Sequence, residues 1–287
     1  MRFGFIAAEK ANYPMRVLCR CLEVSRSGYY AWARRPPSRH AQTDARLTAQ
    51  LRLAHADSGR TYGRPRLVRA LRARGIAVSG KRVARLMRAA GLYARGRRRF
   101  RVTTDSGHAY PVAPNRLRRS FAVQQVNTVW AADLTACATR EGWCYLAVVL
   151  DLASRRVIGW AVRRSPTYEL VMTALRKAVA HRRPRSPLLH HSDRGIQYAS
   201  RAYQDLLARH GITPSMSRVG DCWDNAPVES FFSSFKAEAL PDRPWLDAQE
   251  AAGAIGEYLD FYNRRRLHSS LDYESPMDFE AAARSAV

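Results

Sequence analysis

Three carboxylates stand in stretches rich in other polar and aromatic residues, which makes them candidates for chemistry. Asp133 lies in WAADLT, Asp193 in HHSDRGIQY and Glu229 in GDCWDNAPVESFFSSFKAE. Converging carboxylates repel one another, and proteins tolerate them when divalent cations neutralise the charge; hard oxygen ligands suit Mg²⁺ or Mn²⁺. Two such ions, roughly 3.5–4 Å apart, activate an attacking oxygen and stabilise a leaving oxygen at phosphorus. The three residues predict a two-metal phosphoryl-transfer site if the fold brings them together.

Spacing alone does not identify this site. The separation of Asp193 and Glu229 recurs in three other pairs of acidic residues, which are Asp105 and Glu141, Asp133 and Glu169, and Asp221 and Glu257. The sequence context of the carboxylates and the elements that carry them are therefore more informative than the count.

The elements expected around these residues form an α/β domain. TVWAADLTAC, GWCYLAVVLD and RRVIGWAVRR are β-type runs separated by short turns, which predicts an antiparallel meander with the middle run central. A helix over Tyr168–His181, a strand PLLHHSD, a helix over Ser200–His210 and a strand ITPSMS follow. This order is that of the ribonuclease H-like fold, a mixed five-stranded sheet with helices. Asp133 inside the first strand, Asp193 at the end of the fourth and Glu229 on a later helix would then converge at one sheet edge.

Charge is divided unevenly along the chain, and this division points to a partner. Lys and Arg total 48 against 24 acidic residues, a net charge of +24. Residues 1–125 account for +23 of it, and from Ser58 to Thr104 there are 15 basic residues and no acid. Like charges repel unless a polyanion neutralises them, so this half is expected to contact DNA or RNA. A solvated basic face in an Arg-rich proteome is the alternative.

The basic half has the pattern of a helix-turn-helix unit. Leu67, Ala70 and Leu71 mark one helix that Gly75 ends, and Ser79 is a plausible N-cap for the next, over Lys81–Ala90. The second helix carries four basic residues expected to contact DNA, and an arginine-rich arm follows it. These candidates are Lys81, Arg82, Arg85 and Arg88, with Arg97, Arg98 and Arg99 in the arm.

Composition predicts five segments. They are a helix-turn-helix-like segment with helices near 15–22 and 27–32 (1–44), the basic helix-turn-helix domain with its arm (45–105), a linker (106–124), the catalytic core (125–245), and a C-terminal helix and tail (246–287).

Together with YNRRRLHSSL near the C-terminus, the stretches around the three carboxylates resemble the retroviral-integrase-like DDE transposases of bacterial insertion sequences. The chain is most similar to the second-frame product of the group encoded by two overlapping frames. The resemblance extends from YPMRVLCRCLEVSRSGYYAW to SPMDFE, nearly the whole chain. The chain departs from the pattern of this family at two points. Ala132 stands where relatives often have Thr, and the chain lacks the sustained heptad repeats that the upstream frame supplies in relatives.

The resemblance implies roles for individual residues. Asp133, Asp193 and Glu229 would be the metal-binding catalytic triad, which is expected to hold two ions of Mg²⁺ or Mn²⁺, and Lys236 fills the basic position seven residues after the glutamate. The activity implied is cleavage of double-stranded DNA at the element's terminal repeats, with water as nucleophile, followed by transfer of a 3′-hydroxyl to target DNA. Bringing two ends together implies a homo-oligomer, and the upstream-frame product is a further possible partner.

Other polar residues have structural alternatives. His190 and His191 fall on opposite faces of one strand, so at most one faces the site, and a structural role is favoured for His191. Arg264, Arg265, Arg266 and His268 are predicted to contact DNA, with a solvated helix end as the alternative for the arginines. For Lys236 the alternative is a surface pair with a helical acid. Asp151 is interpreted as a turn former rather than an accessory acid.

One rival function is a non-enzymatic DNA-binding regulator, but a regulator has no use for three carboxylates that repel one another. The other is a ribonuclease H-like nuclease without strand transfer, but such a nuclease has little use for the basic N-terminal region. No apolar run approaches the roughly 20 residues of a membrane span, and a cytoplasmic protein, nucleoid-associated when bound to DNA, is expected. The five irregularly spaced cysteines are expected to be free thiols.

Overall fold

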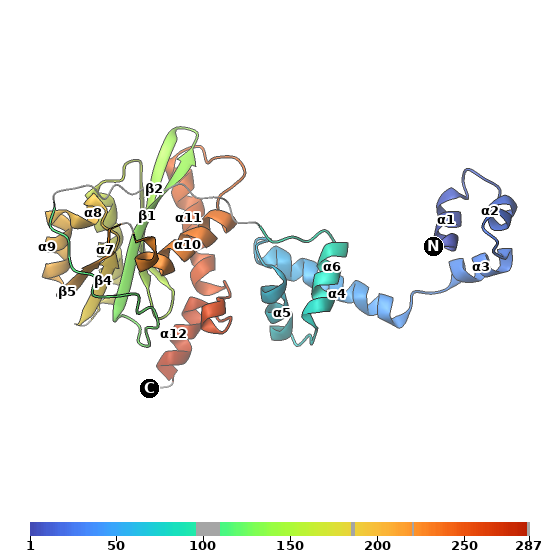
Figure 1. Cartoon of the computed structure of the whole chain (residues 1–287), viewed down its shortest axis with the longest axis horizontal. Helices are drawn as coiled ribbons and strands as arrows, with labels where there is room; N and C mark the ends of the chain where they lie inside the picture. The colour runs from blue at the N-terminus through green and yellow to red at the C-terminus, as the bar shows by residue number, and fades with distance from the viewer. Residues whose placement is uncertain (96–109, 185–186, 220, 286–287) are drawn as a thin grey trace.

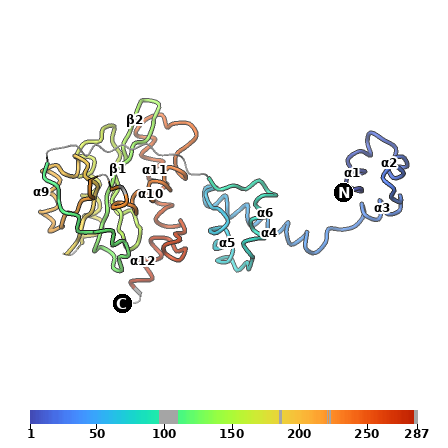
Figure 2. Tube along the Cα trace, viewed as in Figure 1, coloured from blue at the N-terminus to red at the C-terminus, as the bar shows by residue number. Residues whose placement is uncertain are grey.

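A computed structural model describes residues 1–95, 110–184, 187–219 and 221–285. It comprises three groups of elements along the chain: two small helical units and a sheet-containing domain (Figures 1 and 2). No helix in these ranges is long and apolar enough to cross a bilayer. The arginine-rich arm with Arg97, Arg98 and Arg99 lies outside the described residues.

The first unit consists of α1 (Arg2–Glu9), α2 (Met15–Cys21) and α3 (Arg26–Arg34). The sequence predicts α2 and α3 but not α1, whose Ile6 packs with Leu18 and Tyr29 to form a small core. Ser25 caps α3, because its hydroxyl accepts a hydrogen bond from the Gly28 amide at 3.0 Å.

The second unit has the expected helix-turn-helix pattern, in α4 (Arg39–Asp57), α5 (Arg64–Ala73) and α6 (Gly80–Ala89). Ser79 is the N-cap of α6 and accepts from the Arg82 amide. Gly75 and Gly91, at φ +76° and +66°, adopt the left-handed conformation that suits the ends of α5 and α6. Leucines and valines from all three helices form its core, including Leu51, Leu67, Leu71 and Val83.

The sheet-containing domain confirms the expected element order. Its strands are β1 (Val129–Thr139), β2 (Gly142–Asp151), β3 (Val157–Arg163), β4 (Leu188–Ser192) and β5 (Ile212–Met216), in the spatial order β3-β2-β1-β4-β5. The meander is antiparallel, whereas β4 pairs in parallel with β1 and β5. The middle run of the meander, β2, lies between β3 and β1 as predicted, but the centre of the whole sheet is β1.

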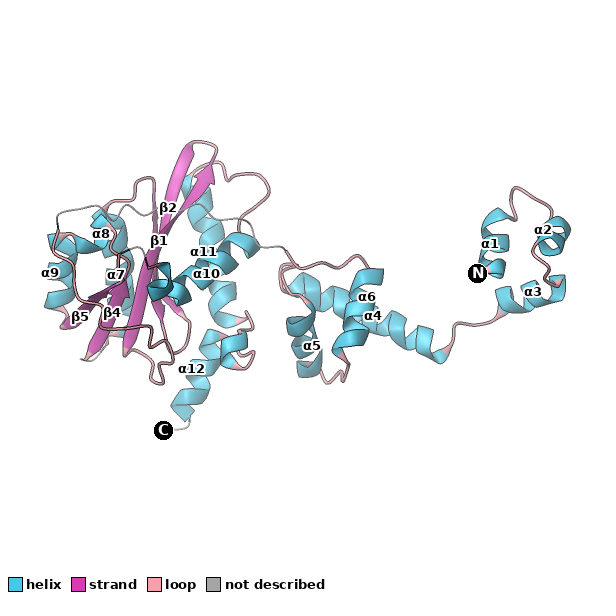
Figure 3. Cartoon of the chain, viewed as in Figure 1, coloured by secondary structure: helices cyan, strands magenta, loops and turns pink. Residues whose placement is uncertain are grey.

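Helices cover both faces of this sheet (Figure 3). On one face α7 (Tyr168–Arg182) and α9 (Arg201–Arg209) pack on Ala132, Ala147 and Val149, with the short α8 (Ile196–Ala199) beside them. On the other face α10 (Ala226–Glu238) and α11 (Ala248–Arg264) pack on Ala131, Leu146 and Val148. Two short 3-10 turns, η1 (Cys222–Asn225) and η2 (Ser269–Leu271), and the helix α12 (Pro276–Ser285) complete the domain.

The helix-turn-helix unit is joined to this domain by polar contacts. The Tyr62 hydroxyl accepts from the Leu267 amide at 2.8 Å and donates to the Arg265 carbonyl at 3.1 Å. The Arg66 guanidinium donates to the Leu267 carbonyl at 2.9 Å and lies 3.5 Å from Glu238 at the end of α10. The DNA-binding candidate and the catalytic candidate therefore share a defined joint.

Gly159 on β3 permits the close packing of α7 on the sheet. A Cβ atom there would collide with the Ala174 carbonyl and lie 2.7 Å from the Ala178 amide nitrogen. We expect Gly159→Ala to lower the free energy of unfolding of this domain by at least about 1–3 kcal/mol, because backbone atoms must move.

Thermal or urea unfolding followed by circular dichroism checks this expectation. Gly253→Ala in α11 is the matched control: nothing lies within 4 Å of its added Cβ, so this change should raise stability by about 0.5–1 kcal/mol. Equal stability of the two variants would contradict the packing argument.

Candidate active site

Asp133 lies inside β1, at the centre of the sheet, and is half-buried. Its Oδ1 accepts a hydrogen bond from the Leu134 amide at 2.7 Å, which fixes the carboxylate beside the strand. Burial raises the pKa of Asp133 well above its usual range, and the charges of Asp193 and Glu229 raise it further. Asp133 is thus a carboxylate whose ionised form the protein disfavours.

Asp193 comes directly after β4, which runs parallel to β1. Ala132 is paired with Ser192 in this ladder, so the next residues of the two strands, Asp133 and Asp193, come side by side. The Asp193 carboxylate accepts from the Gly195 amide at 2.9 Å. A Cβ on Gly195 would lie 2.9 Å from the Gln197 Oε1 and 3.0 Å from the same Asp193 carboxylate oxygen, so both side chains would have to shift to accept it.

Glu229 lies in the first turn of α10, with its side chain exposed. The helix packs through an apolar stripe, since Val228, Phe231, Phe232 and Phe235 are all buried against the sheet. Burial and the charge of Asp193 raise the Glu229 pKa. The third carboxylate therefore belongs electrostatically to the same group as the other two.

Lys236, almost two turns beyond Glu229 on α10, is half-buried. The positive charge of Lys236 lowers the pKa of Asp133. Burial lowers the pKa of Lys236 itself, and the negative charge of Asp133 offsets part of that effect. A cation of the chain thus offsets part of the carboxylate repulsion.

The oxygen atoms of these carboxylates are the kind of ligand that a hard divalent cation prefers. A cation bound between them would favour their ionised forms, which burial and the neighbouring negative charges now disfavour. Within the described ranges, no three His, Cys, Asp or Glu side chains are already arranged so that they could hold a metal ion. The candidate ligands come from the middle of β1, the residue after β4 and the first turn of α10.

Comparison with protein families identifies both functional regions. A model described as "Integrase core domain" matches residues 123–222, a second of the same description matches 210–276, and one described as "HTH-like domain" matches 42–100. Transposase InsF of insertion sequence IS3A from Escherichia coli is 39% identical over 284 residues, 98% of both chains. The chain belongs to the IS3 family of insertion-sequence transposases. An uncharacterised 31 kDa protein of insertion element IS600 from Shigella sonnei is 43% identical, over 91% of this transposase and 97% of that protein.

Solved structures similar to this transposase are retroviral. The integrase catalytic core domain of HTLV-2, in complex with magnesium, matches 53% of this chain and 95% of its own, with 18% identity and a TM-score of 0.41. An intasome of simian T-cell lymphotropic virus in complex with the PP2A regulatory subunit B56 gamma matches 80% and 73%, with 16% identity and a TM-score of 0.45.

The two histidines of β4 have structural partners in the transposase. His190 is buried and shares a hydrogen bond of 3.0 Å with the Tyr203 hydroxyl. His191 is also buried and lies 2.9 Å from the Ser215 hydroxyl, in agreement with the structural role predicted for it. Burial lowers their pKa values to about 3 and about 4, so both are neutral at physiological pH.

Asp151 accepts hydrogen bonds from the amides of Asn127, Ala153 and Ser154, which confirms it as a turn former.

The predicted DNA-contacting residues of α6 fall into two groups. Lys81 and Arg88 are exposed. Arg82 and Arg85 form ion pairs with Asp44 of α4, at 2.7 and 2.5 Å, so these two also hold α6 against α4. A contact with DNA by Arg82 or Arg85 would have to be made beside Asp44.

The four C-terminal residues predicted to contact DNA differ in their exposure to solvent. Arg264 and Arg265 are exposed, and Arg264 pairs with Asp260 at 2.5 Å. Arg266 and His268 are buried instead: the Arg266 guanidinium forms two hydrogen bonds of 2.7 Å with Glu238, and burial lowers the His268 pKa to about 3. Arg266 and His268 therefore belong to the interior and are removed from the DNA-contacting set. The helical acid Glu238, a possible partner for Lys236, pairs with Arg66 and Arg266.

Sequence reasoning missed a buried acid that lies next to the site. Asp224 of η1 is 0% exposed and interacts with Arg119 of the predicted linker and Arg218 after β5. The sequence gives one signal for it, an aspartate five positions before Glu229 in an otherwise uncharged turn, but its two arginine partners come from segments that no local pattern connects.

The raised pKa of Asp133 predicts a cost in stability. At neutral pH an ionised Asp133 is disfavoured in the folded protein relative to the unfolded chain, whose carboxyl has an ordinary pKa. Asp133→Asn removes that charge and should raise the melting temperature in EDTA by about 2–4 °C, which corresponds to roughly 1 kcal/mol.

Because protonation relieves the same penalty, the difference between the wild type and Asp133→Asn should shrink as the pH falls through the raised pKa of Asp133. Scanning calorimetry at several pH values measures it. Asp205→Asn, an exposed aspartate on α9, is the control and should leave the melting temperature unchanged. A lower melting temperature for Asp133→Asn at neutral pH would contradict the assignment.

Proposed function

We propose that this transposase binds the ends of its insertion sequence and catalyses metal-dependent cleavage and strand transfer, with Asp133, Asp193 and Glu229 as ligands of Mg²⁺ or Mn²⁺. The observation that carries the proposal is the β1–β4 ladder, which sets Asp133 beside Asp193, together with the mutual elevation of pKa that includes Glu229. Three ionisable groups that disfavour one another's charge have a use where a cation is to be bound.

Each proposed catalytic residue would have a distinct role in the reaction. Bound divalent cations would supply Lewis acidity for attack at phosphorus. Asp133 and Asp193, fixed by the Leu134 and Gly195 amides, orient their oxygens from the rigid sheet, and Glu229 adds a third carboxylate from α10. We propose two ions, water as the nucleophile for cleavage, and the freed 3′-hydroxyl as the nucleophile for strand transfer.

The proposed DNA-binding surface begins at α6. Lys81, Arg85 and Arg88 are exposed cations of this helix, and Arg82 and Arg85, which lie between Lys81 and Arg88 in the sequence, pair with Asp44. We also propose Lys236, Arg264 and Arg265 as contacts near the catalytic edge, and the arm residues Arg97, Arg98 and Arg99 from the sequence alone. The substrate would be double-stranded DNA, both the terminal repeats and the target. Joining two ends requires at least two copies of the chain, and the upstream-frame product is a further proposed partner.

The proposed division of labour follows the segments expected from the sequence. Residues 45–105 would recognise DNA, residues 125–245 would catalyse, residues 1–44 and 246–287 would support them, and residues 106–124 would connect the halves. Support comes from the apolar core that the α4–α6 unit forms from its own residues, against which Phe261 and Leu267 of the sheet-containing domain pack.

Substitution of the triad tests the catalytic proposal. Asp133→Asn, Asp193→Asn and Glu229→Gln should each abolish Mg²⁺-dependent cleavage and joining of a DNA carrying the element's ends, because metal ligation needs ionised oxygens. Gel-shift affinity for the same DNA should remain within about threefold of the wild type. Cleavage without joining by the wild type would favour a nuclease, and DNA binding without either reaction a regulator. Substantial cleavage by any variant would refute the assignment.

The salt dependence of binding tests the surface on α6. Lys81→Ala and Arg88→Ala should each reduce the slope of log K against log salt by about 1, because each cation that meets a phosphate releases one condensed counterion. Fluorescence anisotropy with a labelled duplex between 50 and 300 mM salt measures the slope. Arg201→Ala, an exposed arginine on α9, is the control. Unchanged slopes for both α6 variants would place the DNA elsewhere.

A further inference from the structure

Asp224 is a buried charge with an unusually complete set of partners. Its two carboxylate oxygens accept hydrogen bonds from the Arg218 amide at 2.9 Å, the Arg218 guanidinium at 3.0 and 2.9 Å, the Arg119 Nε at 2.9 Å and the Asn115 side-chain amide at 2.8 Å. These bonds hold the pKa of Asp224 well below its usual range. The carboxylate is therefore ionised at any working pH, and its burial is compensated by two arginines.

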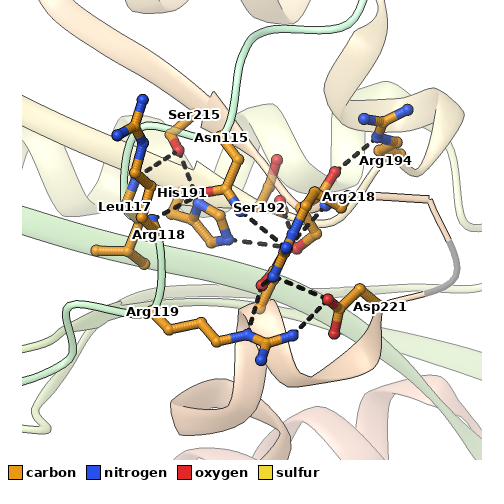
Figure 4. Close-up of polar contacts among 12 residues, drawn as sticks. Asn115, Leu117, Arg118, Arg119, His191, Ser192, Arg194, Ser215, Arg218 and Asp221 are labelled. Atoms are coloured by element: carbon orange, nitrogen blue, oxygen red, sulfur yellow. Dashed lines mark hydrogen bonds and ion pairs between the residues drawn. The ribbon is translucent and has the colours of Figure 1, made fainter.

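The partners of Asp224 come from segments far apart in the sequence. Asn115 and Arg119 belong to the segment before β1, and Arg218 follows β5. Asp221 bridges both arginines on the more exposed side, and Figure 4 shows Arg119 reaching it from the linker. We name Asn115, Arg119, Arg218 and Asp224 the Asp224 clamp.

The linker segment is fixed at a second point. The amides of Arg116 and Leu117 donate to the Ser215 hydroxyl at 2.9 and 3.2 Å, and His191 contacts the same hydroxyl (Figure 4). Leu117 is buried in the core beneath α10 and α11. Arg118 and Arg119 adopt positive φ angles of 46° and 61°, which are uncommon for residues other than glycine and persist where surrounding contacts impose them.

The clamp lies at the start of the helix that carries Glu229. Asp224 and Asn225 end η1, α10 begins at Ala226, and Glu229 is in its first turn. The Asn225 side-chain amide donates to the Ala132 carbonyl at 3.3 Å, next to Asp133. The clamp thus fixes the backbone from which Glu229 projects, while Asn225 ties that backbone to β1.

Glu229 has reason to need such support. Asp133 and Asp193 are set by the β1–β4 ladder, but Glu229 is exposed and is repelled by Asp193. Repulsion favours conformations in which α10 starts farther from the sheet. The buried bonds of Asp224 oppose that displacement without involving Glu229.

We propose that Asp224 is a positioning residue for Glu229, and that the Asp224 clamp, through linker residues Asn115 and Arg119, holds the start of α10 in the place that divalent-cation binding requires. This inference rests on the proposed metal-binding role of the triad. It assigns a function in the catalytic site to two residues that lie 110 and 114 positions before Glu229 in the sequence.

The test compares Mn²⁺ binding by the full-length wild type, Asp224→Asn and Arg119→Gln. Asp224→Asn keeps the shape and removes the charge, and Arg119→Gln is the milder change, because Arg119 is partly exposed and Arg218 remains on Asp224. We expect the Mn²⁺ dissociation constant, measured by electron paramagnetic resonance, to rise roughly 10- to 100-fold in Asp224→Asn, the range for lost supporting bonds around a metal site, and less in Arg119→Gln. Hydrogen exchange at the first turn of α10 should accelerate in both.

Gly159→Ala is the matched control, because it destabilises the same domain from β3 and should leave both Mn²⁺ affinity and α10 exchange as in the wild type. A Mn²⁺ affinity within twofold of the wild type in Asp224→Asn, with normal exchange at α10, would overturn the inference, as would equal losses in Gly159→Ala. If the wild type bound no Mn²⁺, the proposed function would fail at the metal. The positioning role would then be judged by exchange at α10, where wild-type rates in Asp224→Asn would refute it.

Discussion

Repulsion among Asp133, Asp193 and Glu229 is the constraint to which the rest of the catalytic domain responds. Burial raises the pKa of both Asp133 and Glu229, and the charge of Asp193 raises both further. A fold that keeps such a group must hold it with contacts that do not depend on the carboxylates attracting one another. The parallel β1–β4 ladder is one such device, since it pairs Ala132 with Ser192, the residues directly before Asp133 and Asp193, whatever the charge of the two carboxylates.

The third carboxylate is held by different means. Four apolar residues press α10 onto the sheet, and Lys236, farther along the same helix, offsets part of the negative charge at Asp133. At its other end, α10 is linked through Glu238 to Arg66 of the helix-turn-helix unit. One helix therefore connects the candidate site, the core and the helix-turn-helix unit.

Much of this arrangement is predictable from the sequence because it depends on local patterns. Alternating and continuous apolar runs predict the strands, and the cap at Ser79 and the stripe from Val228 to Phe235 are set by residues close in the chain. The pairing of Asp224 with Arg119 escaped prediction because the two residues are 105 positions apart, whereas Arg218 lies six positions from Asp224. Burial of Arg266 escaped because its partner Glu238 lies 28 positions earlier, on α10, and a run of three arginines has the composition of a solvated helix end. The buried His268 contacts Arg266 and the Tyr262 ring.

The joint between the two functional regions has a consequence for how such proteins diversify. Tyr62 and Arg66 bind the amide of Leu267 and the carbonyls of Arg265 and Leu267, which every residue type other than proline supplies. The side chains of Phe261 and Leu267, which pack against the core of the helix-turn-helix unit, and of Glu238 are the parts of this seam that depend on residue type. Under the proposed division of labour, a helical unit that keeps the tyrosine, the arginine and this apolar contact is portable, and new end sequences become accessible by exchanging that unit while the sheet-containing domain stays as it is.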